Sequence, residues 1–154
     1  SDEQLAIYKV VLDAMNAAID MVKPGNHIMQ PQEISEKVIT KGLVKLGLLD
    51  GDPEELHKSG AYKEFYMHKI GHWLGLDVHD AGDYVEGEEY MKFKPGMITT
   101  IEPGIYISSS MDVDDKWKGI GIRIEDDILV TKDGNENLTK KVPSDPEEIE
   151  SLMS

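Results

Sequence analysis

The chain has 154 residues, of which 30% are charged and 40% hydrophobic, and its formal net charge is −14. This length suits one domain with one core, and the negative charge argues against binding to nucleic acid or to anionic membranes. The chain has no cysteine, so disulfides, zinc–thiolate sites and thiol catalysis are excluded, and any metal must be held by His, Asp or Glu.

The first predicted element is a helix with a cap at Ser1 or Asp2. It is expected to stop at the Lys23-Pro24-Gly25 sequence. Its predicted apolar stripe, at steps of three and four, consists of Leu5, Tyr8, Leu12, Met15, Ile19 and Val22. The helix should therefore bury one face along its whole length.

A second helix is expected from Pro31 to about Leu46, and Gly47 is its predicted stop. Its predicted buried face consists of Ile34, Val38, Ile39, Leu43 and Leu46. Residues 54–66 are expected to hold one or two short helices. Near the end of the chain, Asp145 followed by Pro146 predicts the start of another helix.

Strands are predicted after residue 66, where Gly and Pro become frequent and the helical period disappears. Residues 96–102 should form a strand, and residues 105–107 should continue extended. Residues 119–130 are predicted to form one continuous strand. On it, Ile120, Ile122, Ile124 and Asp126 face one way and Gly121, Arg123, Glu125 and Asp127 the other. Helices followed by strands indicate an α+β fold.

Three of the five histidines, His68, His72 and His79, fall within twelve residues. Gly71 and Gly75 lie between them, which argues against a helix and for a turn-rich, tightly packed segment. A single histidine is usually a packing or surface residue. Three of them interleaved with glycines leave both interpretations open, packing and metal binding.

Two glutamates, Glu102 and Glu125, stand inside otherwise apolar strands. A buried carboxylate without a partner costs several kcal/mol, so each needs a cation or strong hydrogen-bond donors. One interpretation is a structural ion pair between Arg123 and Glu125. The other combines both glutamates with residues 68–79, which we call the histidine segment, into a His/Glu/Glu metal cluster. Among manganese, iron, cobalt and zinc, such a cluster suits manganese best.

Four segments together resemble the bacterial-type Xaa-Pro aminopeptidases (aminopeptidase P), metallopeptidases of the creatinase/aminopeptidase or pita-bread fold. They are residues 68–80, 94–97, 100–106 and 119–127, and residues 134–139 and 146–150 fit the same pattern. The resemblance covers nearly the whole chain. It implies that residues 1–154 are the C-terminal part of a catalytic domain, with two long helices followed by antiparallel or mixed strands in an incomplete pita-bread fold.

The resemblance implies a centre of two divalent metal ions. In it, His72 binds one metal, Glu102 binds the same metal and handles the proton of the attacking water, and Glu125 bridges the two metals. The implied reaction is hydrolysis of the N-terminal Xaa-Pro bond by a metal-bridging hydroxide, with peptides that carry proline in second position as substrates.

The resemblance also implies roles for four residues around these ligands. His68 and His79 would bind the substrate around the scissile bond and its proline. Tyr106 and Arg123 would support proton movement or orient the ligands.

In the family, two further aspartate ligands come from paired strands before the first long helix, whereas this sequence starts at that helix. We therefore expect the chain alone to carry three of the family's five metal ligands, to bind metal weakly and to have little or no activity. Missing neighbour strands would leave unpaired backbone, so we also expect a homo-oligomer. We expect a cytoplasmic protein, since no signal peptide and no apolar run of roughly 20 residues is visible.

Two alternatives stay open at this point. One is another enzyme of the same fold, either an Xaa-Pro dipeptidase (prolidase) or a relative without proline specificity. The other is a binding or assembly module that keeps the fold without catalysis.

Overall fold

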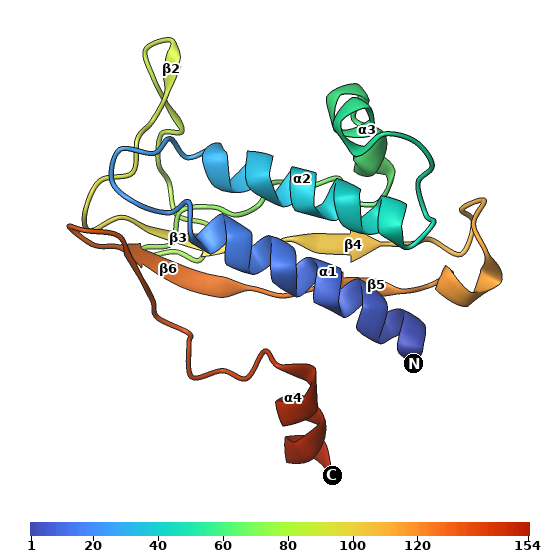
Figure 1. Cartoon of the computed structure of the whole chain (residues 1–154). Helices are drawn as coiled ribbons and strands as arrows, with labels where there is room; N and C mark the ends of the chain where they lie inside the picture. The colour runs from blue at the N-terminus through green and yellow to red at the C-terminus, as the bar shows by residue number, and fades with distance from the viewer.

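Two long helices lie side by side over one face of a layer of strands (Figure 1). The computed structural model describes residues 1–154. In chain order its elements are α1 (Asp2–Ile19), α2 (Gln30–Lys45), α3 (Pro53–Ser59), the 3-10 helix η1 (Ala61–Glu64), β1 (Val85–Glu86), β2 (Glu89–Tyr90), β3 (Ile98–Ile101), β4 (Gly104–Tyr106), the 3-10 helix η2 (Asp115–Trp117), β5 (Gly121–Arg123), β6 (Asp126–Val130), β7 (Asn135–Asn137) and α4 (Pro146–Met153). The predicted α+β class is confirmed. None of the helices is both long and apolar enough to cross a membrane.

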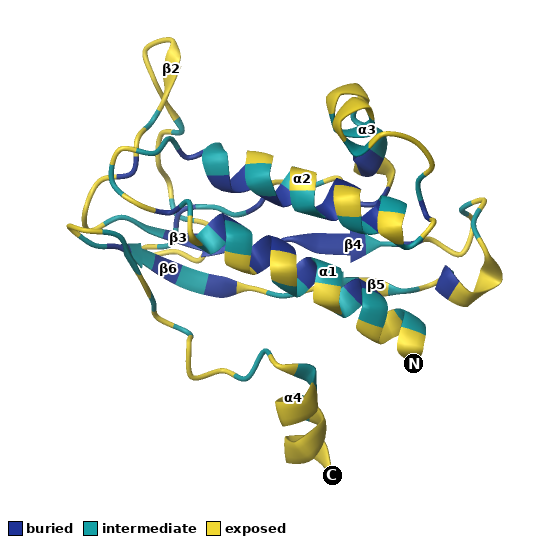
Figure 2. Cartoon of the chain, viewed as in Figure 1, coloured by how far each residue is buried: buried dark blue, intermediate teal, exposed yellow.

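Helix α1 begins where the sequence predicts but buries a different stripe. The Ser1 hydroxyl accepts a hydrogen bond from the Gln4 amide at 3.3 Å, and the N-terminal ammonium donates to the Gln4 side chain at 2.8 Å. The residues of α1 that are fully buried are Ile7, Val11, Ala14, Met15 and Ala18, whereas Leu5 is exposed. The prediction counted only large apolar residues, while the small residues Ala14 and Ala18 are part of the face that α1 buries; Figure 2 shows this buried face in dark blue along the helix.

Helix α2 packs against α1 at close range. A Cβ atom at Gly42 would lie 2.4 Å from Cγ1 of Val10, so only glycine fits at this crossing. Of the predicted buried face, Ile39 and Leu43 are fully buried. Ile34, Val38 and Leu46 are only partly covered, and the remaining buried positions are taken by Pro31 and the polar residues Gln32, Ser35 and Thr40. The predicted stop is correct, since Gly47 has a φ of +73°.

The strands after Ile98 form one long antiparallel pairing that is interrupted in the middle. β3 pairs with β6, and β4 pairs with β5. Both pairings follow a single register, in which Ile101 faces Asp126 and Gly104 faces Arg123. The residues opposite each other in the gap between these pairs are therefore Glu102 and Glu125.

The prediction of one continuous strand over residues 119–130 is wrong, because the strand is broken at residues 124 and 125. Pro103, on the partner strand, has no N–H to donate to the ladder. One long hydrogen bond, from Ile124 N to Pro103 O at 3.4 Å, spans the gap. The predicted facing is correct: Ile122 and Ile124 contact the apolar core, while Arg123 and Glu125 are exposed on the opposite side.

The histidine segment lies along the other edge of β3. Three backbone hydrogen bonds join them: Glu102 N to Ile70 O (2.7 Å), Thr100 N to His72 O (3.0 Å) and Leu74 N to Ile98 O (3.1 Å). A Cβ atom at Gly71 would lie 1.9 Å from the Thr100 carbonyl oxygen, so the two backbones touch here. The predicted tight, non-helical packing of this segment is confirmed.

A buried amide side chain ties helix α2 to the histidine segment. The Ile70 N–H donates to Oε1 of Gln32, which is 7% exposed, and Gln32 Nε2 donates to Glu36 Oε1 at 2.9 Å. The other oxygen of Glu36 lies 3.2 Å from His57 Nε2. These contacts hold the histidine segment at a fixed position relative to α2.

The remaining elements lie around this body. Strand β7 pairs with β6, and the β1–β2 hairpin projects away from the helices (Figure 1). As predicted, Asp145 caps α4 by accepting from the Glu147 and Glu148 amides, at 3.0 and 3.1 Å. Helix α4 has no buried residue (Figure 2).

We predict that Gln32→Met lowers the free energy of unfolding by about 1–3 kcal/mol, because the Ile70 N–H and the Glu36 carboxylate would lose a buried partner. Urea denaturation of the purified chain measures the change. Lys37→Ala, on the exposed side of the same helix, is the control and should change stability by less than about 0.5 kcal/mol. Equal stability of Gln32→Met and wild type would contradict the bridging role of the amide.

Candidate metal centre

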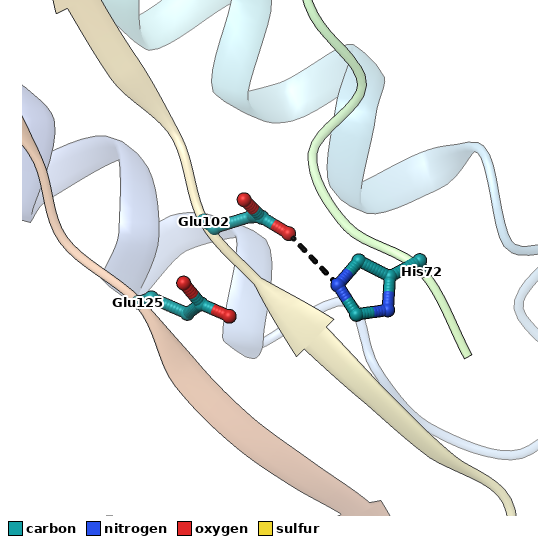
Figure 3. Close-up of side chains that lie close together, drawn as sticks. All are labelled: His72, Glu102 and Glu125. Carbon is teal, nitrogen blue, oxygen red and sulfur yellow. Dashed lines mark ion pairs between the residues drawn. The ribbon is translucent and has the colours of Figure 1, made fainter. Parts of the chain in front are cut away.

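Three side chains from separate parts of the sequence converge on one spot. One ligand atom from each of His72, Glu102 and Glu125 lies within 4.8 Å of the other two (Figure 3). Strand register explains this convergence. His72 is paired with Thr100, Glu102 is two residues further along the same strand, and Glu125 lies across from Glu102. Side chains two apart on a strand share a face, so all three project from the same side.

The imidazole of His72 is oriented by its own backbone neighbour. Its Nδ1 lies 3.0 Å from the Trp73 carbonyl oxygen, which can only accept, so Nδ1 carries the proton. The other nitrogen, Nε2, is free and lies 3.4 Å from Oε1 of Glu102. A histidine fixed in this way by a carbonyl is typical of metal ligands.

The two glutamates place like charges directly across from each other, which destabilises paired strands. Glu125 is exposed as a residue, but partial desolvation of its carboxyl group and then the charge of Glu102 raise its pKa above the usual 4.5. A bound cation would relieve this repulsion. The donor set of one neutral imidazole and two carboxylates therefore fits a divalent metal ion.

Arg123 takes a different partner from the one first considered. Its guanidinium lies 3.7 Å from Oε2 of Glu102, and no ion pair within 4 Å joins it to Glu125. The interpretation of a structural Arg123–Glu125 pair is therefore wrong. With half of its side chain exposed, Arg123 balances part of the negative charge at Glu102 without closing the site.

The other predicted site residues surround the cluster in two places. The His79 ring lies beside that of His72, with their centroids 4.3 Å apart, and His79 is exposed. His68 forms a separate pair with Tyr106: its Nδ1 donates to the Lys69 carbonyl at 2.8 Å, so its Nε2 accepts from the Tyr106 hydroxyl at 2.8 Å. The tyrosine ring has room because residue 104 is a glycine. A Cβ atom there would lie 2.5 Å from the Tyr106 hydroxyl oxygen.

A further carboxylate, that of Asp126 at the start of β6, has a structural role. It is 8% exposed and lies on the face that packs toward the core. Asn137 Nδ2 donates to one of its oxygens at 2.8 Å, and the Thr139 hydroxyl donates to the other. Because both oxygens have protein donors, this buried acid needs no cation.

Sequence reasoning missed Thr100, whose hydroxyl contacts both His72 and Glu102. A threonine two residues before a glutamate on a strand shares that residue's face, which is the one signal that could have found it. That signal is weak, because threonine is common in strands for packing reasons alone.

The model of Metallopeptidase family M24 matches residues 1–132, so the chain belongs to this family of metallopeptidases. Over its full length it is 48% identical to a Xaa-Pro aminopeptidase of Haemophilus influenzae, of which it covers 36%. Among solved structures, aminopeptidase PepP of Pseudomonas aeruginosa matches 99% of the chain with 55% identity and a TM-score of 0.98. Zinc-substituted aminopeptidase P of Escherichia coli, in complex with product, matches 99% with 45% identity and a TM-score of 0.94.

These matches confirm the predicted resemblance to Xaa-Pro aminopeptidases and the predicted pita-bread fold. The chain spans only about a third of its relatives, since it covers 36% of the Haemophilus protein and 35% of the Pseudomonas chain. Its fold is accordingly part of the fold of those longer proteins.

We predict that Glu125→Gln raises the melting temperature of the metal-free chain at pH 7. A carboxyl group whose pKa is raised by folding favours the folded state below its unfolded value of 4.5, and this contribution is lost as the pH rises through the higher folded value. Removing the ionisable group removes that loss at neutral pH.

Thermal unfolding in EDTA at pH 7 and at pH 3.5 measures the effect. The gain should be present at pH 7 and shrink at pH 3.5, where wild-type Glu125 is itself protonated. Glu136→Gln, an exposed position on β7, is the control. A stability loss for Glu125→Gln at pH 7 would show that the charge of Glu125 stabilises the chain.

Proposed function

We propose that residues 1–154 are the C-terminal part of the catalytic domain of a proline-specific aminopeptidase, which hydrolyses the bond between an N-terminal residue and a following proline. One observation carries the proposal: the predicted ligands His72, Glu102 and Glu125 converge in a chain of family M24. Curated relatives at 46–48% identity are Xaa-Pro aminopeptidases.

The proposed cofactors are two divalent ions, with Mn²⁺ favoured by the carboxylate-rich donor set and Zn²⁺, Co²⁺ or Fe²⁺ as alternatives. Such ions acidify water and polarise a carbonyl oxygen. Three side chains supply too few ligands for two ions. We therefore propose that segments outside these 154 residues complete the centre, in keeping with the greater length of the relatives.

The proposed ligands divide their tasks according to their contacts. His72 binds through Nε2, because its Nδ1–H is committed to Trp73. Glu102 has Oε1 occupied by the Thr100 hydroxyl, so Oε2, which has only the Arg123 guanidinium at 3.7 Å, would take a proton from the attacking water. Glu125, which lies opposite Glu102, would contribute its carboxylate to both proposed ions.

Substrate contacts are proposed for the two other histidines of the segment. His79 is exposed beside His72, which leaves it free to hydrogen-bond a peptide near the scissile carbonyl. His68 is held by the Tyr106 hydroxyl and would contact the proline side of the bond. Arg123, beside Glu102, would orient that carboxylate during proton transfer.

Two rival functions are separated by the choice of peptide. A prolidase would cleave Xaa-Pro dipeptides and leave longer peptides intact, whereas the proposed aminopeptidase cleaves longer Xaa-Pro peptides. A non-catalytic module would cleave neither, and the three intact ligands weigh against it because a decayed site should lose ligands. We also propose a cytoplasmic location, which cell fractionation would test.

We predict that the protein containing this chain, supplied with Mn²⁺, releases the first residue of Xaa-Pro-Xaa tripeptides and not of matched Xaa-Ala-Xaa peptides. Glu102→Gln should lower kcat by about 10²–10⁴-fold, since a proton acceptor is lost. Glu136→Gln serves as the control. Amino-acid release measured by chromatography decides the outcome, and equal cleavage of both peptides would rule out proline specificity.

We predict that the chain forms homo-oligomers, because exposed strand edges pair readily with a second copy. Static light scattering at increasing concentration measures the molar mass. A mass that stays at the monomer value of 17.2 kDa at high concentration would refute this prediction.

A further inference from the structure

The hydroxyl of Thr100 lies between two of the three proposed metal ligands. The His72 backbone N–H donates to its Oγ1 at 3.1 Å, and Oγ1 donates to Oε1 of Glu102 at 3.0 Å. Thr100 is 2% exposed, so water does not compete for these bonds. It is the one side chain that hydrogen-bonds both residues.

The direction of the two hydrogen bonds is fixed by chemistry. A backbone N–H can only donate, so Oγ1 accepts from His72 and its single proton is left for Glu102. The oxygen that accepts this hydrogen bond, Oε1 of Glu102, is also the one that lies 3.4 Å from His72 Nε2. The hydroxyl therefore holds one edge of the Glu102 carboxylate against the imidazole.

The local backbone is shaped to allow this contact. A Cβ atom at Gly71 would lie 2.9 Å from Oγ1 of Thr100 as well as 1.9 Å from its carbonyl oxygen. Any other residue at position 71 would push the hydroxyl away from the His72 N–H. A β-branched residue such as Thr also has few rotamers, which keeps Oγ1 in place.

The neighbouring Thr99 provides a natural comparison. Its hydroxyl lies 3.1 Å from the His72 carbonyl oxygen and 3.2 Å from that of Thr100, and it does not contact Glu102. Thr99 is 8% exposed, so both threonines are buried. They differ in that only Thr100 links the histidine to the glutamate.

We propose that Thr100 is a positioning residue of the metal centre: its hydroxyl couples the main chain of His72 to the carboxylate of Glu102, so that the two ligands keep one mutual geometry. Thr100 acts through these residues, because both hydrogen bonds of its hydroxyl are made to them. The inference rests on the proposed metal centre for its consequence, but the coupling itself exists in the metal-free chain.

Three variants test the coupling. Thr100→Val replaces the hydroxyl by a methyl group of similar volume, Thr100→Ser keeps the hydroxyl, and Thr99→Val removes the neighbouring hydroxyl as the matched control. Two quantities are measured on the purified chain: amide hydrogen exchange of His72 in EDTA, and Mn²⁺ affinity by isothermal titration calorimetry.

In Thr100→Val we expect the His72 amide to exchange at least about tenfold faster, since its acceptor is gone. We expect the Mn²⁺ affinity of Thr100→Val to fall by about 10–100-fold, the usual effect of removing a partner that orients a metal ligand. Thr100→Ser and Thr99→Val should stay within about threefold of wild type in Mn²⁺ affinity.

Two results would overturn the inference: wild-type exchange and affinity in Thr100→Val, or an equal loss of affinity in Thr99→Val. If Thr100→Val does not fold, Thr100→Cys takes its place, because a thiol is only a weak donor; it must then lose affinity relative to Thr100→Ser. If wild type binds no Mn²⁺, the proposed metal centre fails for this chain, and His72 exchange alone decides the role of Thr100.

Discussion

Strand β3 is paired along both edges, with β6 on one side and the histidine segment on the other, and the proposed metal centre takes its geometry from this double pairing. One edge fixes the histidine segment and the other fixes β6, whose first residue directly follows Glu125. A slip of one residue on either edge would turn a ligand to the opposite face of the layer. Backbone hydrogen bonds between these segments are thus what brings an imidazole and two carboxylates together.

The same pairing has an electrostatic cost. Glu102 and Glu125 face each other with like charges, and partial desolvation, followed by the charge of Glu102, raises the pKa of Glu125. Arg123 offsets part of that charge from the rim of the site. Natural sites keep such repulsion where a ligand relieves it, so stability given up here is consistent with a binding role.

Much of this arrangement could be predicted from the sequence, because helix caps, stops and strand alternation depend on local chemistry. The Ser1 cap, the Gly47 stop and the shared exposed face of Arg123 and Glu125 are examples. The errors came from tertiary partners. Which face α1 buries depends on what packs against its alanines, and the break at Glu125 depends on a proline in another strand.

The site shows the same division. Residue chemistry alone left a His/Glu/Glu cluster as one of two interpretations, and it was the family resemblance that singled out His72, Glu102 and Glu125 as expected ligands. The orienting groups could not be recognised, because a buried hydroxyl such as that of Thr100 gains its role only through the distance to its partners. The role of the Gln32 amide, inside a helix, could not be predicted from the sequence either.

The close crossing at Gly42 has a consequence for mutations far from the chemistry. A larger side chain there would force α2 away from α1, since helix spacing follows the size of the residues at the contact. Gln32, on the same helix, would move with it and pull on the backbone of Ile70, two residues before the proposed ligand His72. Substitutions in the helix layer, far from the proposed metal centre, would thereby change its cation affinity, because α2 would move as a rigid body.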